Sequence, residues 1–255
     1  MIVKVLGAHN CETRDTRLTS LLLDDTVAID AGGLTSSLSM GEQLNLKAVL
    51  LTHQHYDHIR DIPSLLMNLY LHNSSIDIYA SQEVYQVLSG YLMNGDVYPE
   101  FFKEGPKGPA AIFIPVEPYR SYTISDYEIF TARSNHSVPT MAFQITSAEG
   151  KKVLYTGDTG PGLEFWQQVS PHLLITEVIA SNRYNSFALE KGHLTPSLLE
   201  GELKIFREVH NYLPQVAVIH LYPDLEDEIK SELNEVIKNL QHPITSGYEG
   251  MGINL

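Results

Sequence analysis

The residues best suited to chemistry form one short run, HQHYDH at positions 53–58, directly after the apolar segment 48–52. The run places the imidazoles of His53, His55 and His58 and the carboxylate of Asp57 within six residues. Helices and strands repeat about every 3.6 and 2 residues, so neither can direct all four side chains to one side. A loop can fold them around a point, and such ligands suit zinc, manganese or iron. The run predicts a site for two metal ions rather than a surface loop rich in histidine by chance.

Composition limits the class of protein. With 255 residues, 43% of them hydrophobic, the chain can bury a sizeable core, which excludes disorder and a small disulfide scaffold. Its single cysteine, Cys11, cannot form an intramolecular disulfide, and neither a signal-like nor a membrane-spanning stretch is evident. We therefore expect a cytoplasmic protein with no membrane partner. The net charge of −14 disfavours extended nucleic acids, which are bound by stripes of Lys and Arg.

Sequence patterns predict the elements that must position the 53–58 run. Strands are expected at 2–6, 18–25, 26–33, 48–52, 111–116, 127–133, 141–147, 152–156, 172–179, 215–220 and 250–255. Helices are expected at 36–46, 60–71, 82–94, 163–169, 196–210 and 225–240. Glycines and prolines make 95–118 an irregular insert. This order predicts an α/β fold in which two sheets lie back to back with helices outside, a four-layer αββα sandwich forming one domain over residues 1–255.

Four more candidate residues lie beside the predicted strands and helices. His136 in SNHSVP, Asp158 in YTGDTG and His220 in AVIHLYP each follow a predicted strand. Strand ends are where α/β sheets usually place their sites. His193 in GHLTP opens a predicted helix, and from the residues alone it is either a site residue or an ordinary surface residue.

The run H-x-H-x-D-H, followed in order by His136, Asp158 and His220, resembles the signature of the metallo-β-lactamase superfamily. The resemblance covers nearly the whole chain and implies the four-layer metallo-β-lactamase fold with two divalent ions, zinc first and manganese or iron as alternatives. It implies that one ion is bound by His53, His55 and His136. The second would be bound by Asp57, His58 and His220, with Asp158 bridging the two.

Two residues differ from the pattern of particular branches of this superfamily and so narrow the set of branches that the chain resembles. Asp158 stands where true β-lactamases have a cysteine, and His55 stands where the diiron oxygen-reducing relatives have a carboxylate. The GHLTP segment most resembles the class II cyclic-nucleotide phosphodiesterases and the ribonuclease Z-like branch. The resemblance makes His193 a proton donor to the leaving oxygen and Glu177 the acid that keeps it protonated, because an opposite charge favours the charged imidazole. Asp57 is counted with these two as catalytic.

The implied activity is phosphodiester hydrolysis of a small substrate such as a cyclic nucleotide, through a metal-bridging hydroxide. A ribonuclease Z-like nuclease acting on short RNA or DNA is the enzymatic alternative. The short segment between His136 and Asp158 and the net charge of −14 disfavour transfer RNA as the substrate of such a nuclease. A non-catalytic metal-binding interaction module is the third hypothesis, although degenerate members usually lack ligands and all seven ligand positions are filled here.

Several other residues are open to two interpretations. Asp30 in AIDAGG either orients a motif histidine or starts a turn. His9 either contacts substrate or is merely solvated, and Cys11 has no assigned role. The aromatic residues around the insert, among them Phe101 and Phe102, either stack on a base or pack together. A homodimer formed through the helix at 225–240 would be compatible with its amphipathic pattern.

Overall fold

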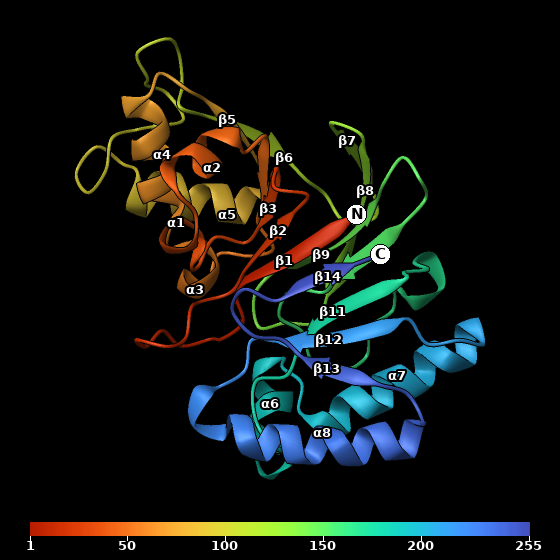
Figure 1. Ribbon diagram of the computed structural model, residues 1–255. Coiled ribbons are helices and arrows are strands. Elements are labelled where there is room, and N and C mark those ends of the chain that lie inside the picture. The colour runs from red at the N-terminus through yellow and green to blue at the C-terminus, as the bar shows by residue number, and fades with distance from the viewer. The chain divides into compact units, whose positions relative to one another are not determined.

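The computed structural model describes residues 1–255, which divide into two compact units. Unit 1 consists of Met1–Gly7, Arg17–Glu117 and Glu249–Asn254, and unit 2 of Ala8–Thr16, Pro118–Tyr248 and Leu255. Each unit contains one seven-stranded sheet with helices packed on it, which confirms the α/β class (Figure 1). That the two units form one domain with an insert stays a prediction.

The sheet of unit 1 is mixed, in the order β14-β1-β2-β3-β4-β5-β6. The first four strands in this order pair antiparallel and β3 to β6 pair parallel. Their bounds are β1 Ile2–Gly7, β2 Ser20–Leu23, β3 Val27–Ile29, β4 Ala48–Leu50, β5 Ile76–Ala80, β6 Ala111–Pro115 and β14 Gly252–Asn254. The central strands β2, β3 and β4 are apolar at nearly every position and wholly buried.

Asp24, Asp25 and Asp30 explain why the strands predicted at 18–25 and 26–33 are shorter in the structure. Asp24 and Asp25 have φ of 41° and 57° and form the predicted turn between β2 and β3. Asp30 has φ of 56° and ends β3. Aspartate tolerates this left-handed backbone better than most residues, because its short polar side chain can hydrogen-bond locally.

Helices lie on one side of the unit 1 sheet (Figure 1). They are α1 Leu34–Ser37, α2 Met40–Asn45, α3 Tyr56–Ile59, α4 Ile62–Leu71 and α5 Gln82–Val87, the last followed by a π-helical turn at Leu88–Leu92. The single helix predicted at 36–46 is wrong, because Ser39 takes an extended conformation and caps α2 in a reciprocal capping box with Glu42.

The insert is irregular up to β6, as predicted, and its aromatic residues pack inward. Phe101 is fully buried in the unit 1 core, with its ring centroid 5.8 Å from that of Tyr70 and 6.4 Å from that of Tyr98. Phe102 stands 5.0 Å from the Tyr85 ring. The packing interpretation of these aromatic residues therefore holds.

The sheet of unit 2 has the order β13-β12-β11-β10-β9-β8-β7. Strands β7 to β10 pair antiparallel, and β10 to β13 pair parallel. Their bounds are β7 Ser121–Ile124, β8 Tyr127–Ser134, β9 Thr140–Thr146, β10 Lys152–Tyr155, β11 Leu173–Glu177, β12 Gln215–Ile219 and β13 Ile244–Ser246. The two edge strands, β7 and β13, were not predicted, and neither was β5 of unit 1.

Unit 2 carries α6 Asn185–Lys191, α7 Pro196–His210 and α8 Glu226–Leu240, and α7 and α8 lie side by side (Figure 1). The apolar face of α8, with Ile229, Leu233 and Val236, is buried in the unit 2 core. That face is occupied within the unit, so its pattern is no argument for a homodimer. No helix in the structure combines the length and apolar character needed to cross a bilayer.

The helix predicted at 163–169 is wrong, because only one 3₁₀ turn forms, at Trp166–Gln168. The buried carboxylate of Glu202 accepts hydrogen bonds from the Gly162 and Leu163 N–H groups, at 2.7 and 3.4 Å. It also accepts one from the Trp166 indole Nε1, at 2.8 Å. The Glu202 side chain thus satisfies backbone N–H groups that, in the first turn of a helix, would need water or a capping residue as partner.

Candidate metal centre

In unit 1, the run at 53–58 begins as a loop after β4 and continues into the single helical turn of α3. His53 and His58 are fully buried, and their ring centroids lie 4.2 Å apart. The His55 ring lies 4.6 Å from that of His53, and the Asp57 carboxylate lies 3.7 Å from His58 Nε2. The four predicted ligands of this run therefore gather in one place within unit 1.

The buried carboxylate of Asp30 organises this group. It accepts a 2.7 Å hydrogen bond from His58 Nδ1 and a 2.9 Å bond from the Thr52 N–H. The Thr52 hydroxyl group donates its single proton to Asp30. The Thr52 oxygen lies 3.0 Å from His53 Nδ1, so it must accept a hydrogen bond from the His53 ring. Both imidazoles thereby keep the lone pair on Nε2 for a metal ion, which is how hydrogen-bonded partners orient ligand histidines. The orienting interpretation of Asp30 fits this geometry.

In unit 2, the candidate ligands follow three different strands. His136 comes after β8, Asp158 after β10 and His220 after β12. The Asp158 Oδ2 atom lies 3.9 Å from His136 Nε2 and 3.4 Å from His220 Nε2. His220 has φ of 63°, an uncommon conformation for a non-glycine residue and one that often marks functional sites.

Asp158, His220 and His193 form a cluster that fits a divalent cation. One potential ligand atom from each lies within 4.8 Å of the other two, and all three side chains are buried. Imidazole nitrogens with a carboxylate oxygen are a donor set that zinc and neighbouring transition metals accept. The cluster is therefore compatible with a divalent metal site.

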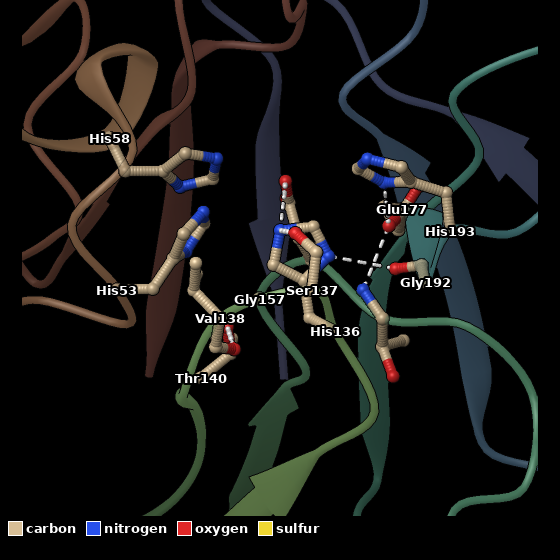
Figure 2. Close-up of polar contacts among 12 residues, drawn as sticks. His53, His58, His136, Ser137, Val138, Thr140, Gly157, Glu177, Gly192 and His193 are labelled. Atoms are coloured by element: carbon tan, nitrogen blue, oxygen red, sulfur yellow. Dashed lines mark hydrogen bonds and ion pairs between the residues drawn. The ribbon is translucent and has the colours of Figure 1, made fainter. Parts of the chain in front are cut away.

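His193 is held by Glu177, as Figure 2 shows. Its Nδ1 donates a 2.6 Å hydrogen bond to Oε1 of Glu177, which is 1% exposed. The same carboxylate accepts from the N–H groups of Thr159 and Leu194, at 2.8 and 3.4 Å. Because an ionised carboxylate can only accept hydrogen bonds, Nδ1 of His193 carries a proton. The other ring nitrogen, Nε2, points away from Glu177. The His193 ring is stacked on the His220 ring with centroids 5.9 Å apart.

Sequence reasoning missed two partners of the histidines. His136 Nδ1 donates a 2.8 Å hydrogen bond to the Gly192 carbonyl (Figure 2). This bond orients Nε2 toward Asp158, whose Oδ2 lies 3.9 Å away. Thr52 plays the corresponding role for His53. A backbone carbonyl leaves no signal in residue type, whereas the adjacency of Thr52 to the run could have pointed to it.

We expect Gly192→Ala to disturb this arrangement. Gly192 has φ of 73°, and an added Cβ would lie 2.7 Å from His136 Cα and 2.9 Å from the Asn135 oxygen. Gly150→Ala is the matched control, since Gly150 has φ of 78° but nothing within 4 Å of the added Cβ. Both variants should lose about 1–2 kcal/mol of stability from the left-handed backbone. Only Gly192→Ala should also bind metal more weakly, by about tenfold or more in a competitive chelator titration. Equal metal affinity in the two variants would contradict the role given to the Gly192 carbonyl.

His9 and Cys11 lie on the segment of unit 2 that follows β1. His9 is 3% exposed and lies 3.3 Å from a carboxylate oxygen of Glu226, so it is not a solvated loop histidine. Partial burial raises the pKa of Glu226, but the hydrogen bonds from Lys230 and His9 outweigh burial and leave that pKa below its ordinary value. Cys11 is exposed.

A sequence model described as the Beta-lactamase superfamily domain matches residues 34–221, more than half of the chain. The chain belongs to the metallo-β-lactamase superfamily. This membership confirms the resemblance seen in the sequence and places the chain in a superfamily of hydrolases. No curated protein sequence matches it.

Solved structures share the fold of this superfamily member over its whole length. The metallo-β-lactamase fold protein YhfI from Bacillus subtilis is 19% identical, with a TM-score of 0.77 over 99% of this chain and 98% of that one. Unliganded yeast PDE1 is 16% identical, with a TM-score of 0.84 over 100% and 99%. The short form of human tRNase Z is 18% identical, with a TM-score of 0.72 over 100% and 99%. The predicted α/β metallo-β-lactamase sandwich fold is confirmed.

Proposed function

We propose that this chain is a metal-dependent phosphodiesterase that cleaves a small phosphodiester such as a cyclic nucleotide. The observation that carries the proposal is the buried Glu177–His193 pair, in which one nitrogen of the imidazole is held by a carboxylate. A histidine held in this way, with a ring nitrogen within 4.8 Å of potential ligand atoms of Asp158 and His220, is suited to give a proton to a departing oxygen. β-Lactam hydrolysis has no such support in these residues.

The metal ligands remain those that the resemblance implies. His53, His55 and His136 would hold one divalent ion, and Asp57, His58 and His220 a second, with Asp158 bridging. Zinc is our first choice, with manganese or iron as alternatives, because all three accept imidazole and carboxylate ligands. Two such ions supply activation of water and neutralisation of charge on the phosphate.

The chain's own residues then act as follows. Asp30 and Thr52 fix the proton positions of His58 and His53 through the hydrogen bonds described above. Glu177 orients His193 and stabilises its imidazolium form, because the carboxylate supplies an opposite charge. His193 Nε2 delivers its proton to the leaving oxygen. Asp57 lies in the first turn of α3 and is the third catalytic residue, acting through its carboxylate.

A nuclease acting on short RNA or DNA is the second candidate, favoured by the similarity to tRNase Z. The segment between His136 and Asp158 weighs against transfer RNA. It consists of strands β9 and β10, which pair antiparallel around a turn closed by the Ser147 N–H on the Lys151 oxygen. That leaves no additional arm for a large RNA. A cytoplasmic location, which the single cysteine favours, stays a prediction as well.

The test is hydrolysis of bis(p-nitrophenyl) phosphate by protein reconstituted separately with zinc, manganese and iron, with metal content measured on the same samples. We expect turnover that rises with bound metal to two ions per chain. Asp158→Ala should lose metal and turnover together. Cyclic nucleotides and short oligonucleotides would then distinguish the two candidate substrates. No turnover at full metal occupancy would refute the phosphodiesterase proposal and favour a metal-binding interaction module.

A further inference from the structure

A cavity of about 340 Å³ opens in unit 2 beside the residues that follow β11 and β12. Ile179 and Ala180, which come soon after Glu177, line it together with Tyr222, which comes soon after His220. Backbone hydrogen bonds join these segments, from the Ile179 N–H to the Leu194 oxygen at 3.0 Å and from the Tyr222 N–H to the Ile179 oxygen at 3.1 Å. The cavity wall is therefore a continuation of the backbone that carries Glu177, His193 and His220.

Aromatic rings form much of the rest of the lining. Tyr184, Phe187 and Tyr222 line the cavity while remaining 41%, 48% and 37% exposed. Tyr184 is the residue directly before α6, and Phe187 lies in the first turn of that helix. The Arg183 guanidinium covers the Tyr184 ring at 5.0 Å from its centroid and also pairs with Glu228 at 2.9 Å, which steadies the ring. Large rings left half exposed around one cavity are typical of a binding surface.

One polar group enters this apolar lining. The Asn10 side-chain oxygen is buried and accepts no hydrogen bond. The residue itself is fixed, because its N–H donates to the Leu221 oxygen at 3.3 Å. An asparagine amide can both donate to and accept from the edge of a purine base. No side chain with a full charge lines the cavity, so the lining suits a neutral group rather than a phosphate.

We propose that this cavity is a nucleobase subsite, which stacks a neutral heteroaromatic ring against the Tyr184, Phe187 and Tyr222 side chains and bonds its edge to Asn10. Its volume lies at the lower end of the range of about 300–1,000 Å³ typical of ligand pockets. Stacking on aromatic side chains is the usual way in which proteins hold unpaired bases. The proposal deepens the phosphodiesterase proposal, on which it rests for the reacting phosphate, and it commits to a nucleoside as one of the two esterified groups.

The test is equilibrium binding of adenosine, which has no phosphate, to the metal-loaded chain and its variants. Phe187→Ala should weaken adenosine binding by about five- to 150-fold, the range measured when a stacking side chain is removed. Asn10→Ala should weaken it as well. Leu189→Ala is the matched control, because Leu189 lies on the same helix and is exposed but does not line the cavity. It should bind adenosine as the unaltered chain does. Ribose 5-phosphate, which lacks the base, should bind all these forms alike.

Two results would overturn the subsite. One is the absence of saturable adenosine binding by the unaltered chain, and the other is equal adenosine affinity in the Phe187→Ala and Leu189→Ala variants. Hydrolysis of bis(p-nitrophenyl) phosphate without adenosine binding would refute the subsite and leave the phosphodiesterase proposal standing. Adenosine binding that depends on Phe187, without any diester hydrolysis, would support the subsite and refute the phosphodiesterase proposal.

Discussion

His193→Ala should lower the turnover of a nucleoside phosphodiester by about 100- to 10,000-fold while leaving the metal content unchanged. The expected loss is large because a poor leaving oxygen needs a proton as its bond to phosphorus breaks. The buried carboxylate of Glu177 holds His193 in place for that step. The measurement is kcat for the diester together with metal analysis of the same protein.

The leaving group distinguishes this role from others. Bis(p-nitrophenyl) phosphate has a leaving group that departs without protonation, so its hydrolysis should fall far less in His193→Ala than that of the nucleoside diester. Glu177→Gln should show the same dependence on leaving group with a smaller loss. If His193→Ala instead loses metal and hydrolyses both substrates equally poorly, His193 is a metal ligand, as its place in the cluster with Asp158 and His220 would also permit.

The second large effect is expected from Asp30→Ala. The variant removes a fully buried carboxylate that accepts hydrogen bonds from the Thr52 N–H, the Thr52 hydroxyl and His58 Nδ1. Leaving these donors buried without their partner should cost about 3–5 kcal/mol of unfolding free energy. Metal affinity should fall by about 10- to 100-fold, because the orientation of His58 is lost. Urea unfolding and chelator titration measure the two effects.

Asp61→Ala is the control for that experiment. Asp61 is also a buried carboxylate of unit 1, and it accepts from the Thr35 N–H and hydroxyl at 2.8 and 2.9 Å and from Arg60 at 3.0 Å. No hydrogen bond joins it to a candidate ligand. It should therefore lower stability with little change in metal affinity. The orienting role of Asp30 fails if the two variants weaken metal binding equally.

The elements that could be predicted from sequence carry strong local signals. Helix α7 occupies the predicted residues 196–210, because Pro196 suits a first helical turn and Asn211 ends the helix in a left-handed conformation. The missed strands β7 and β13 are short edge strands of four and three residues, whereas the missed strand β5, Ile76–Ala80, lies inside its sheet between β4 and β6. Helix α6 was also missed, since only Ala188 of its seven residues is buried and no apolar period marks it.

The candidate site likewise divides into side chains that could be predicted from sequence and contacts that could not. Its side chains were found because imidazoles and carboxylates at strand ends are visible in the sequence, and the Glu177–His193 pair forms as the resemblance implied. The Gly192 carbonyl beneath His136 could not be found, because every residue has a carbonyl and only the fold decides where it points. The Glu202 network at Trp166 escaped for a similar reason, since its partners lie some 40 residues away along the chain.

The pairing of β1 with β14 has a consequence for biosynthesis. Val3 lies opposite Ile253, so one side of β1 gains its partner only after residues 252–254 have been made. At typical rates of about 5–20 residues per second, that edge stays open on the ribosome for roughly 10–50 seconds. An uncovered strand edge is a template for wrong pairing with neighbouring chains. Nascent unit 1 is therefore a natural client for chaperones that shield such edges until β14 has been made.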